Sequence, residues 1–179
     1  LEYIVPVVMG GARARQMQHP NLEPAQAVLP VFIHGDAAFS GEGVVMESLQ
    51  MSATNAYHVG GSIHLILNNQ IGFTTSSVSD ARTSTYAAGV ASMIEAPIFH
   101  VHGEDFAAIY KVVSLALAYR MRFKKDVVID FVGFRRPGHN EADEPRVTQP
   151  LMYQKVDQHP GVSKLFSDSL VAKQICDEK

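Results

Sequence analysis

The sequence predicts an α/β fold, in which a mostly parallel, twisted β-sheet is flanked by helices. Four short apolar runs alternate along the chain with segments that have helical spacing or room for a helix. Strands and helices that alternate in this order form βαβ units, whose strands run parallel. Polar motifs follow three of the four runs directly. Residues at the carboxyl ends of parallel strands are typical ligand-binding positions, so the pattern also predicts a binding site.

The first predicted strand covers residues 28–33 (VLPVFI) and ends just before a Gly-Asp pair. Pro30 lies within this run, and proline favours an edge strand or a bulge because it cannot donate to the hydrogen-bond ladder. A helix is predicted over residues 43–56, where apolar side chains recur at spacings of three and four residues. These two elements place Asp36 at the junction between a strand and a helix.

The second predicted strand covers residues 63–67 (IHLIL) and delivers Asn68 and Asn69 at its end. The Ser- and Thr-rich stretch that follows, residues 74–85, is interpreted as an ordered loop. Residues 86–94 then form a short helix.

The third predicted strand covers residues 98–102 (IFHVH), and residues 106–121 then carry a long amphipathic stripe. Acidic residues at positions 104 and 105 favour the positive amino-terminal end of that helix. The fourth strand, residues 127–132 (VVIDFV), leads into a loop rich in arginine and glycine. With four strands and their connections, the chain has the elements of one α/β domain.

Length and composition indicate a globular domain. The chain has 179 residues, of which 46% are hydrophobic and 18% are charged. Its net charge of −3 argues against nucleic acid as a partner, and no apolar run approaches the roughly 18 residues of a membrane helix. The single Cys176 cannot form an internal disulfide, which favours a reducing compartment.

The domain boundaries follow from the same pattern. We expect residues 1–160 to form a diphosphate-binding α/β domain and residues 161–179 to form a flanking helix or a linker. Because Leu1 is not a methionine and the chain stops within a polar stretch, we expect it to be a segment of a longer protein.

Asp36 and Asn69 have the spacing of a metal-diphosphate site. They are 69 − 36 = 33 residues apart, which leaves room for one helix and one strand. Mg²⁺ prefers hard oxygen ligands and takes few of them from side chains, leaving the others to phosphates and water. Gly-Asp after a strand is also typical of a turn and helix cap, and Asn-Asn is typical of a turn. The presence of both motifs at the correct spacing favours the metal site.

A third polar motif, RRPGHNE, follows the fourth strand. Its arginines and His139 could donate hydrogen bonds to phosphate oxygens or to a substrate carboxylate. The alternative is a surface turn in which Arg135 and Arg136 pair with nearby acidic residues, namely Glu141, Asp143 and Glu144. The residues of this loop alone favour neither interpretation.

Other chemistries have weaker support. His34 precedes the Gly-Asp pair and is placed to support that loop, whereas His64, His100 and His102 lie in strand-like runs. The sequence has no Cys/His spacing for zinc, no nucleophile elbow and no phosphate-binding loop ending in Gly-Lys-Ser/Thr.

Together these motifs resemble those of the thiamine diphosphate enzymes, whose signature is Gly-Asp-Gly followed at a similar distance by Asn or Asn-Asn. The stretches HGDAAFSGEGVV, NNQIGFTTS and RRPGHNEADEPRVTQPLMYQK are similar to one branch, the 2-oxoglutarate dehydrogenase E1 family, in which Gly-Asp-Ala is usual. The resemblance covers residues 1–160, and several motifs agree in order and spacing. It implies the thiamine diphosphate-binding fold of that family.

The resemblance implies a set of site residues for thiamine diphosphate and Mg²⁺. The metal would be bound by the side chains of Asp36 and Asn69 and by the Ile71 carbonyl. The cofactor would be contacted by Asp36, Ala37, Ala38, Asn69 and His139. His139 would also be catalytic, because it would face both the diphosphate and the reacting centre.

The resemblance implies oxidative decarboxylation of 2-oxoglutarate and succinyl transfer to a lipoyl-bearing E2 partner, the dihydrolipoyl succinyltransferase. A homodimer is also implied, located in the bacterial cytoplasm or the mitochondrial matrix. The activating glutamate and the ligands of the distal substrate carboxylate would lie outside this chain, so we expect little or no turnover from it alone. Two alternatives stay open, namely the same chemistry on 2-oxoadipate and a non-catalytic binding module that retains the fold.

Overall fold

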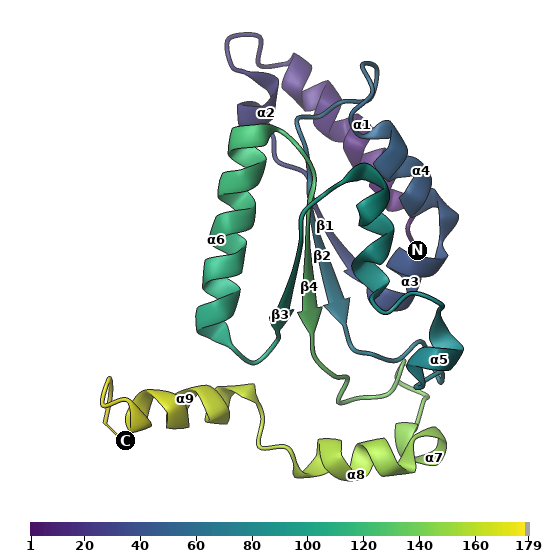
Figure 1. Ribbon diagram of the computed structural model, residues 1–179, viewed down its shortest axis with the longest axis vertical. Coiled ribbons are helices and arrows are strands. Elements are labelled where there is room, and N and C mark those ends of the chain that lie inside the picture. Colours follow the sequence, from purple (N-terminus) through teal and green to yellow (C-terminus); the bar gives the residue numbers. More distant parts are fainter. Residues whose placement is uncertain (178–179) are drawn as a thin grey trace.

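The computed structural model describes residues 1–177 and shows a four-stranded, all-parallel sheet (Figure 1). Its strands are β1 (Val31–Gly35), β2 (Ile63–Asn68), β3 (Ile98–His102) and β4 (Val127–Val132), and they lie in the order β1-β2-β4-β3. This architecture confirms the predicted α/β class. Three of the strands begin where the apolar runs predicted.

Helices cover both faces of the sheet and extend past its lower edge (Figure 1). In chain order they are α1 (Ile4–Met17), α2 (Pro24–Ala27), α3 (Asp36–Gly41), α4 (Gly43–Met51), α5 (Val78–Ala81), the 3₁₀-helix η1 (Ala87–Ile94), α6 (Phe106–Phe123), α7 (Pro145–Thr148), α8 (Pro150–Gln158) and α9 (Val162–Ala172). Helix α6 lies on one face, whereas α1, α3, α4 and η1 lie on the other. Helices α7 to α9 run beyond the carboxyl ends of the strands.

The strands contribute side chains to two apolar layers, one on each face of the sheet, because successive side chains of a strand point to opposite faces. On the α3 and η1 side, Phe39 and Leu49 pack with Ile66 of β2. On the α6 side, Ala116 packs with Ile129 of β4. The sheet is thereby packed on both faces.

The structure corrects two predicted boundaries. The first strand begins at Val31 rather than at position 28, so Pro30 precedes the strand. Its carbonyl accepts a hydrogen bond from the Ile63 N–H at 3.0 Å. The helix predicted over residues 43–56 begins at Gly43 as expected but ends at Met51, and a separate short helix, α3, precedes it, divided from it by the extended residue Glu42.

Other predicted elements agree with the structure. The predicted loop over residues 74–85 contains the short helix α5. Helix α6 starts where the acidic pair indicated, and the Asp105 carboxylate accepts a hydrogen bond from the Ala108 N–H at 2.9 Å. Helix α9 occupies most of the stretch predicted as a flanking helix or linker. Within residues 1–177, no helix is both long and apolar enough to cross a membrane.

Arg120 connects α6 to the amino-terminal side of the sheet. Its side chain is fully buried and donates hydrogen bonds to backbone carbonyl oxygens in the segments that precede β1 and β2. These acceptors are Gly61 at 3.0 Å, Val28 at 3.0 Å, Val59 at 3.4 Å and Ala25. One side chain therefore satisfies four backbone acceptors that water reaches poorly.

Candidate functional site

The sheet brings Asp36 and the Asn68-Asn69 pair to the same edge. Strands β1 and β2 are parallel neighbours, and Gly35 lies opposite Leu67. Asp36 is therefore level with Asn68, and Asn69 lies one residue further on. Neighbouring strands are only about 4.8 Å apart, so the two motifs are adjacent in space.

A cavity of about 490 Å³ lies beside this edge, and its walls contain four of the predicted site residues, Asp36, Ala37, Ala38 and His139. Asn69 lines an adjacent hollow of about 350 Å³ between the ends of β2 and β4, together with Arg135. Ile71 is buried, whereas its neighbours Gln70 and Gly72 line the larger cavity. The fold therefore gathers most predicted site residues around one cavity and places Asn69 beside it.

Asp36 is a buried carboxyl group with a cation nearby. Only 3% of the residue is exposed, and its Oδ2 lies 3.8 Å from Nη1 of Arg82. Burial raises the pKa of Asp36, an effect that the Arg82 charge opposes and the charge of Asp130 reinforces. A second cation at this carboxylate would therefore favour its ionised form.

The Asn-Asn pair forms tight turns, as its alternative interpretation predicted. Asn69 Oδ1 accepts a hydrogen bond from the Ile71 N–H at 3.1 Å, and Asn68 Oδ1 accepts one from the Gln70 N–H at 3.0 Å. Gln70 has a positive φ of 64°, a conformation that residues other than glycine adopt rarely and mostly in turns. An amide oxygen has two lone pairs, so the turn leaves Asn69 able to bind a cation as well.

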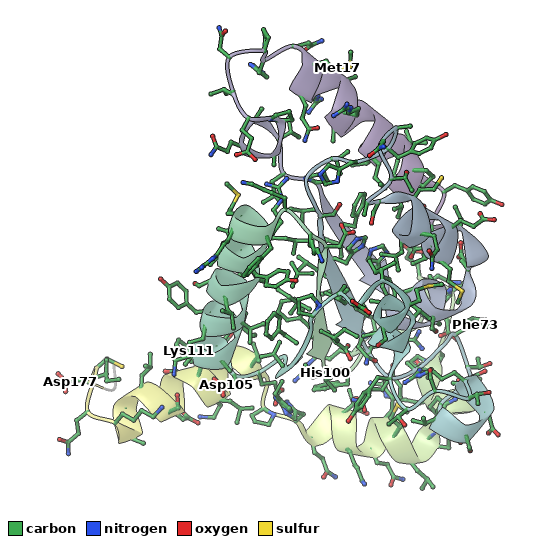
Figure 2. All side chains as sticks on the ribbon, turned by 45° about the horizontal axis from the view of Figure 1, so that its top comes forward. Met17, Phe73, His100, Asp105, Lys111 and Asp177 are labelled. Atoms are coloured by element: carbon green, nitrogen blue, oxygen red, sulfur yellow. The ribbon has the colours of Figure 1, made fainter. Side chains whose placement is uncertain are left out.

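The His139 loop is tied to the loop after β2. The Arg135 guanidinium donates to the Phe73 carbonyl at 3.1 Å, and the His139 ring meets the Phe73 ring edge-on, with centroids 4.7 Å apart. Phe73 is labelled in Figure 2, where it lies at the edge of the molecule. Arg136 donates to the His159 carbonyl at 2.9 Å. Both arginines thus have partners other than the acidic residues of the surface-turn alternative.

Gly138 fits the tight course of this loop. A Cβ atom at position 138 would overlap the carbonyl oxygen of Asp143. The Asp143 carboxylate in turn accepts a hydrogen bond from the His139 N–H at 2.8 Å. These contacts hold the exposed His139 side chain against the cavity wall.

Beneath β1 and β2 lies a buried chain of polar side chains. His34 Nδ1 is 2.6 Å from Glu2 Oε2, and His34 Nε2 is 3.0 Å from His64 Nδ1. Burial lowers the pKa of His34 and lowers that of His64 to about 4, so both rings are neutral at pH 7. With the Glu2 carboxylate as acceptor, His34 carries its proton on Nδ1 and accepts from His64 through Nε2.

The sequence patterns did not predict that three further residues lie near the site. Arg82 lies in the Ser- and Thr-rich loop, Glu2 lies just before α1, and Asp130 lies inside an apolar strand. Asp130 is fully buried, and its Oδ2 is 2.8 Å from Nδ1 of His100, which is labelled in Figure 2. Their contacts join segments far apart in the sequence, so only the folded chain shows them.

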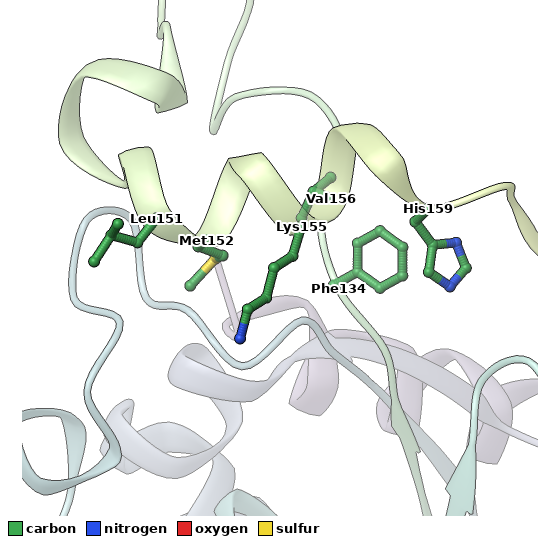
Figure 3. A pocket seen from close by; sticks show the side chains of 6 residues that line it. All are labelled: Phe134, Leu151, Met152, Lys155, Val156 and His159. Carbon is green, nitrogen blue, oxygen red and sulfur yellow. The ribbon is translucent and has the colours of Figure 1, made fainter.

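An apolar groove of about 420 Å³ lies further along, between Phe134 and helix α8 (Figure 3). Lys155 and His159 are its polar wall residues, and the others are Phe134, Leu151, Met152 and Val156. This lining does not suit a metal or a diphosphate, because both need converging oxygen or N–H groups. The groove contains none of the predicted site residues.

The residues at the sheet edge fit a magnesium-diphosphate group. They offer a carboxylate, an amide oxygen and backbone carbonyls, which are hard oxygen donors, and small side chains at positions 37 and 38. Among residues 1–177, no group of three or more His, Cys, Asp or Glu side chains could hold a metal ion. A cation here would therefore need phosphate, carbonyl or water oxygens to complete its ligand shell.

Comparison with known proteins gives consistent matches. Residues 2–179 match the family described as the dehydrogenase E1 component. The chain is 54% identical, over 98% of its length, to the 2-oxoglutarate dehydrogenase E1 component of Coxiella burnetii, of which it covers 19%. It is 53% identical, over 98% of its length, to the protein of that name from Cupriavidus necator, of which it covers 18%.

A differently named protein also matches. The chain is 49% identical, over 97% of its length, to the multifunctional 2-oxoglutarate metabolism enzyme of Mycolicibacterium vanbaalenii, of which it covers 14%. The chain thus spans less than a fifth of the length of each of these three relatives. The match to the family extends over nearly the whole chain, and the chain belongs to the dehydrogenase E1 component family.

Proposed function

We propose that the chain is the diphosphate-binding part of a 2-oxoglutarate dehydrogenase E1 enzyme that uses thiamine diphosphate and Mg²⁺. The observation that carries the proposal is the cavity that gathers Asp36, Ala37, Ala38 and His139 beside the strand that bears Asn69. The names of the relatives support 2-oxoglutarate as the substrate.

Asp36, Asn69 and the Ile71 carbonyl would hold Mg²⁺ through oxygen atoms. Asp36 suits this role because burial raises its pKa, so a bound dication would stabilise the ionised carboxylate. Asn69 and Ile71 belong to one turn, closed by the hydrogen bond from the Ile71 N–H to Asn69 Oδ1. Two of the three ligands would therefore be held by the same short piece of backbone.

Ala37 and Ala38 would leave room for the cofactor, and His139 would donate a hydrogen bond to the diphosphate or to a group at the reacting centre. An imidazole can also accept or release a proton near neutral pH, which suits a catalytic role. When bound, thiamine diphosphate supplies the carbanion chemistry of decarboxylation, and the protein supplies position and charge.

Calorimetry on the natural full-length protein tests the cofactor assignment. Wild type should bind thiamine diphosphate in the presence of Mg²⁺, and Asp36→Ala should weaken that binding at least about 100-fold, since it removes a charged metal ligand. Glu47→Ala is the matched control, because Glu47 is exposed on α4 outside the cavity lining. Unchanged binding by Asp36→Ala would show that the metal assignment is wrong.

The finer parts of the proposal are the substrate and the partners. We propose that the complete enzyme is a homodimer that passes the succinyl group to a lipoyl-bearing E2, the dihydrolipoyl succinyltransferase. Comparing initial rates on 2-oxoglutarate and 2-oxoadipate checks the substrate, and a higher kcat/KM for 2-oxoadipate would reverse the assignment. Succinylation of the lipoyl domain, followed by mass spectrometry, checks the partner.

A further inference from the structure

Arg82 is positioned to act in the cavity beside Asp36. It lies directly after α5 and lines the cavity together with Asp36 and His139. Its guanidinium is 3.8 Å from the Asp36 carboxylate, a distance at which charges attract without an optimal hydrogen bond. The pair is therefore an ion pair with unused hydrogen-bonding capacity.

The guanidinium group has a donor without an acceptor. Arg82 Nε is buried, and among the described residues it has no hydrogen-bond partner. A buried unpaired donor is costly, and arginine presents its donors as a planar fork that matches phosphate or carboxylate oxygens. An anion in the cavity would give this fork the acceptor that the protein itself does not supply.

The segment that carries Arg82 is lightly anchored. Helix α5 has no buried residue, and it lies at the rim of the molecule, past the end of β2 (Figure 1). By contrast, Asp36 is held between β1 and the core residue Phe39. Of the two partners, the arginine is therefore the one that can move when a ligand enters.

A metal at Asp36 would change the balance of charge around Arg82. Mg²⁺ and Arg82 would compete for one carboxylate, and a dication at close range outweighs a guanidinium group at 3.8 Å. The diphosphate that accompanies the metal would bring new anionic oxygens into the same cavity. Arg82 would then exchange the carboxylate for phosphate oxygens, with which it can form paired hydrogen bonds.

We propose that Arg82 binds the diphosphate of the cofactor and, before the metal arrives, is the counter-ion of Asp36. The inference rests on the proposed function and adds a residue that none of the sequence motifs contains. Arg82 is therefore expected to matter differently for the two ligands. Loss of Arg82 should weaken binding of the diphosphate, but it should not weaken binding of the metal alone.

The test uses Arg82→Met and Arg82→Lys in the natural full-length protein, with Arg122→Met as the control. Arg122 is exposed on α6, where its guanidinium lies 5.5 Å from the centroid of the Phe123 ring, away from the cavity. Calorimetry measures thiamine diphosphate binding at saturating Mg²⁺. Electron paramagnetic resonance measures Mn²⁺ binding without the cofactor, and circular dichroism verifies that each variant is folded.

Arg82→Met should weaken thiamine diphosphate binding by about 10- to 100-fold, the range for a charged hydrogen bond. Arg82→Lys should lie between this variant and wild type, because it keeps the charge but loses the fork. Mn²⁺ alone should bind Arg82→Met as tightly as wild type or more tightly. Arg122→Met should match wild type in both measurements.

Two results would overturn the inference and leave the proposed function standing. One is wild-type affinity of Arg82→Met for thiamine diphosphate while Asp36→Ala loses binding. The other is an equal loss of Mn²⁺ and thiamine diphosphate binding in Arg82→Met, which would mean that Arg82 only positions Asp36. Failure of wild type to bind thiamine diphosphate would instead contradict the proposed function itself.

Discussion

Replacing Arg120 with methionine should loosen the amino-terminal ends of β1 and β2. Methionine has a similar length and helix propensity, so α6 can keep its course. The substitution removes the Arg120 donors from the carbonyls of Ala25, Val28, Val59 and Gly61. The Val59 carbonyl keeps a second donor, the side-chain amide of Gln16 at 2.8 Å. These carbonyl groups belong to the backbone, so they remain in the variant as acceptors.

The size of the effect follows from the number of acceptors left unpaired. A buried acceptor that loses its partner costs about 1–3 kcal/mol, and three acceptors, the carbonyls of Ala25, Val28 and Gly61, lose theirs. Part of the cost is offset, because removing a buried cation also removes its desolvation penalty and water can reach some of the carbonyls. We expect a net loss of about 3–5 kcal/mol, comparable to breaking a buried ion pair.

Hydrogen–deuterium exchange of the natural full-length protein measures this loss locally. A cost of about 3 kcal/mol corresponds to roughly a 100-fold fall in the protection of amides in β1 and β2. Arg122→Met is the control, since an exposed cation over an aromatic ring contributes at most about 1 kcal/mol. A fall of less than about fivefold in Arg120→Met would mean that these hydrogen bonds do not hold the starts of the strands.

Three further predictions concern the site and its support. Lowering the pH from 7 to 5 should destabilise the protein by about 2 kcal/mol through His64, because burial lowers its folded-state pKa from 6.5 to about 4. The free energy of unfolding that depends on neutral His64 is fully present above about pH 6.5 and is lost as the pH falls toward 4. Urea unfolding at pH 7 and at pH 5 measures the difference. Gly138→Ala should weaken thiamine diphosphate binding about tenfold, because its Cβ would displace the Asp143 carbonyl and with it the His139 loop, as calorimetry would show. Asp36→Asn should raise the Tm of the cofactor-free protein at pH 7. Burial raises the pKa of the Asp36 carboxyl, so the stability linked to its protonated form is lost as the pH rises through that pKa, whereas asparagine stays neutral.

Each of these predictions has its own control and contrary outcome. His64→Phe should flatten the pH dependence, whereas the exposed His19→Gln should leave it unchanged; an equally steep profile in both would contradict the assignment. Gly133→Ala has open space for its Cβ atom, so equal losses in the two glycine variants would rule out the clash. A lower Tm of Asp36→Asn would mean that the ion pair with Arg82 outweighs the cost of burial.

Local sequence patterns were enough to predict the fold class and three of the four strands. The runs that became β2, β3 and β4 are apolar and bounded by polar motifs, so local composition specifies them. The start of α6 was also predicted, because a cap such as Asp105 acts on its own helix. The start of the first strand and the end of the helix predicted over residues 43–56 were wrong, since the points where the chain leaves a strand or a helix depend on the sheet and the core around it.

The assembly of the site depends on contacts between segments that are far apart in the sequence. The motifs indicated Asp36, Asn69 and His139, but the parallel register and the Arg135 contact with Phe73 are what bring them to one edge. Arg82 carried no signal, because its role depends on a neighbour 82 − 36 = 46 residues away. Sequence patterns record the local periodicity of burial, whereas charge pairing across a cavity depends on distances that exist only after the chain has folded.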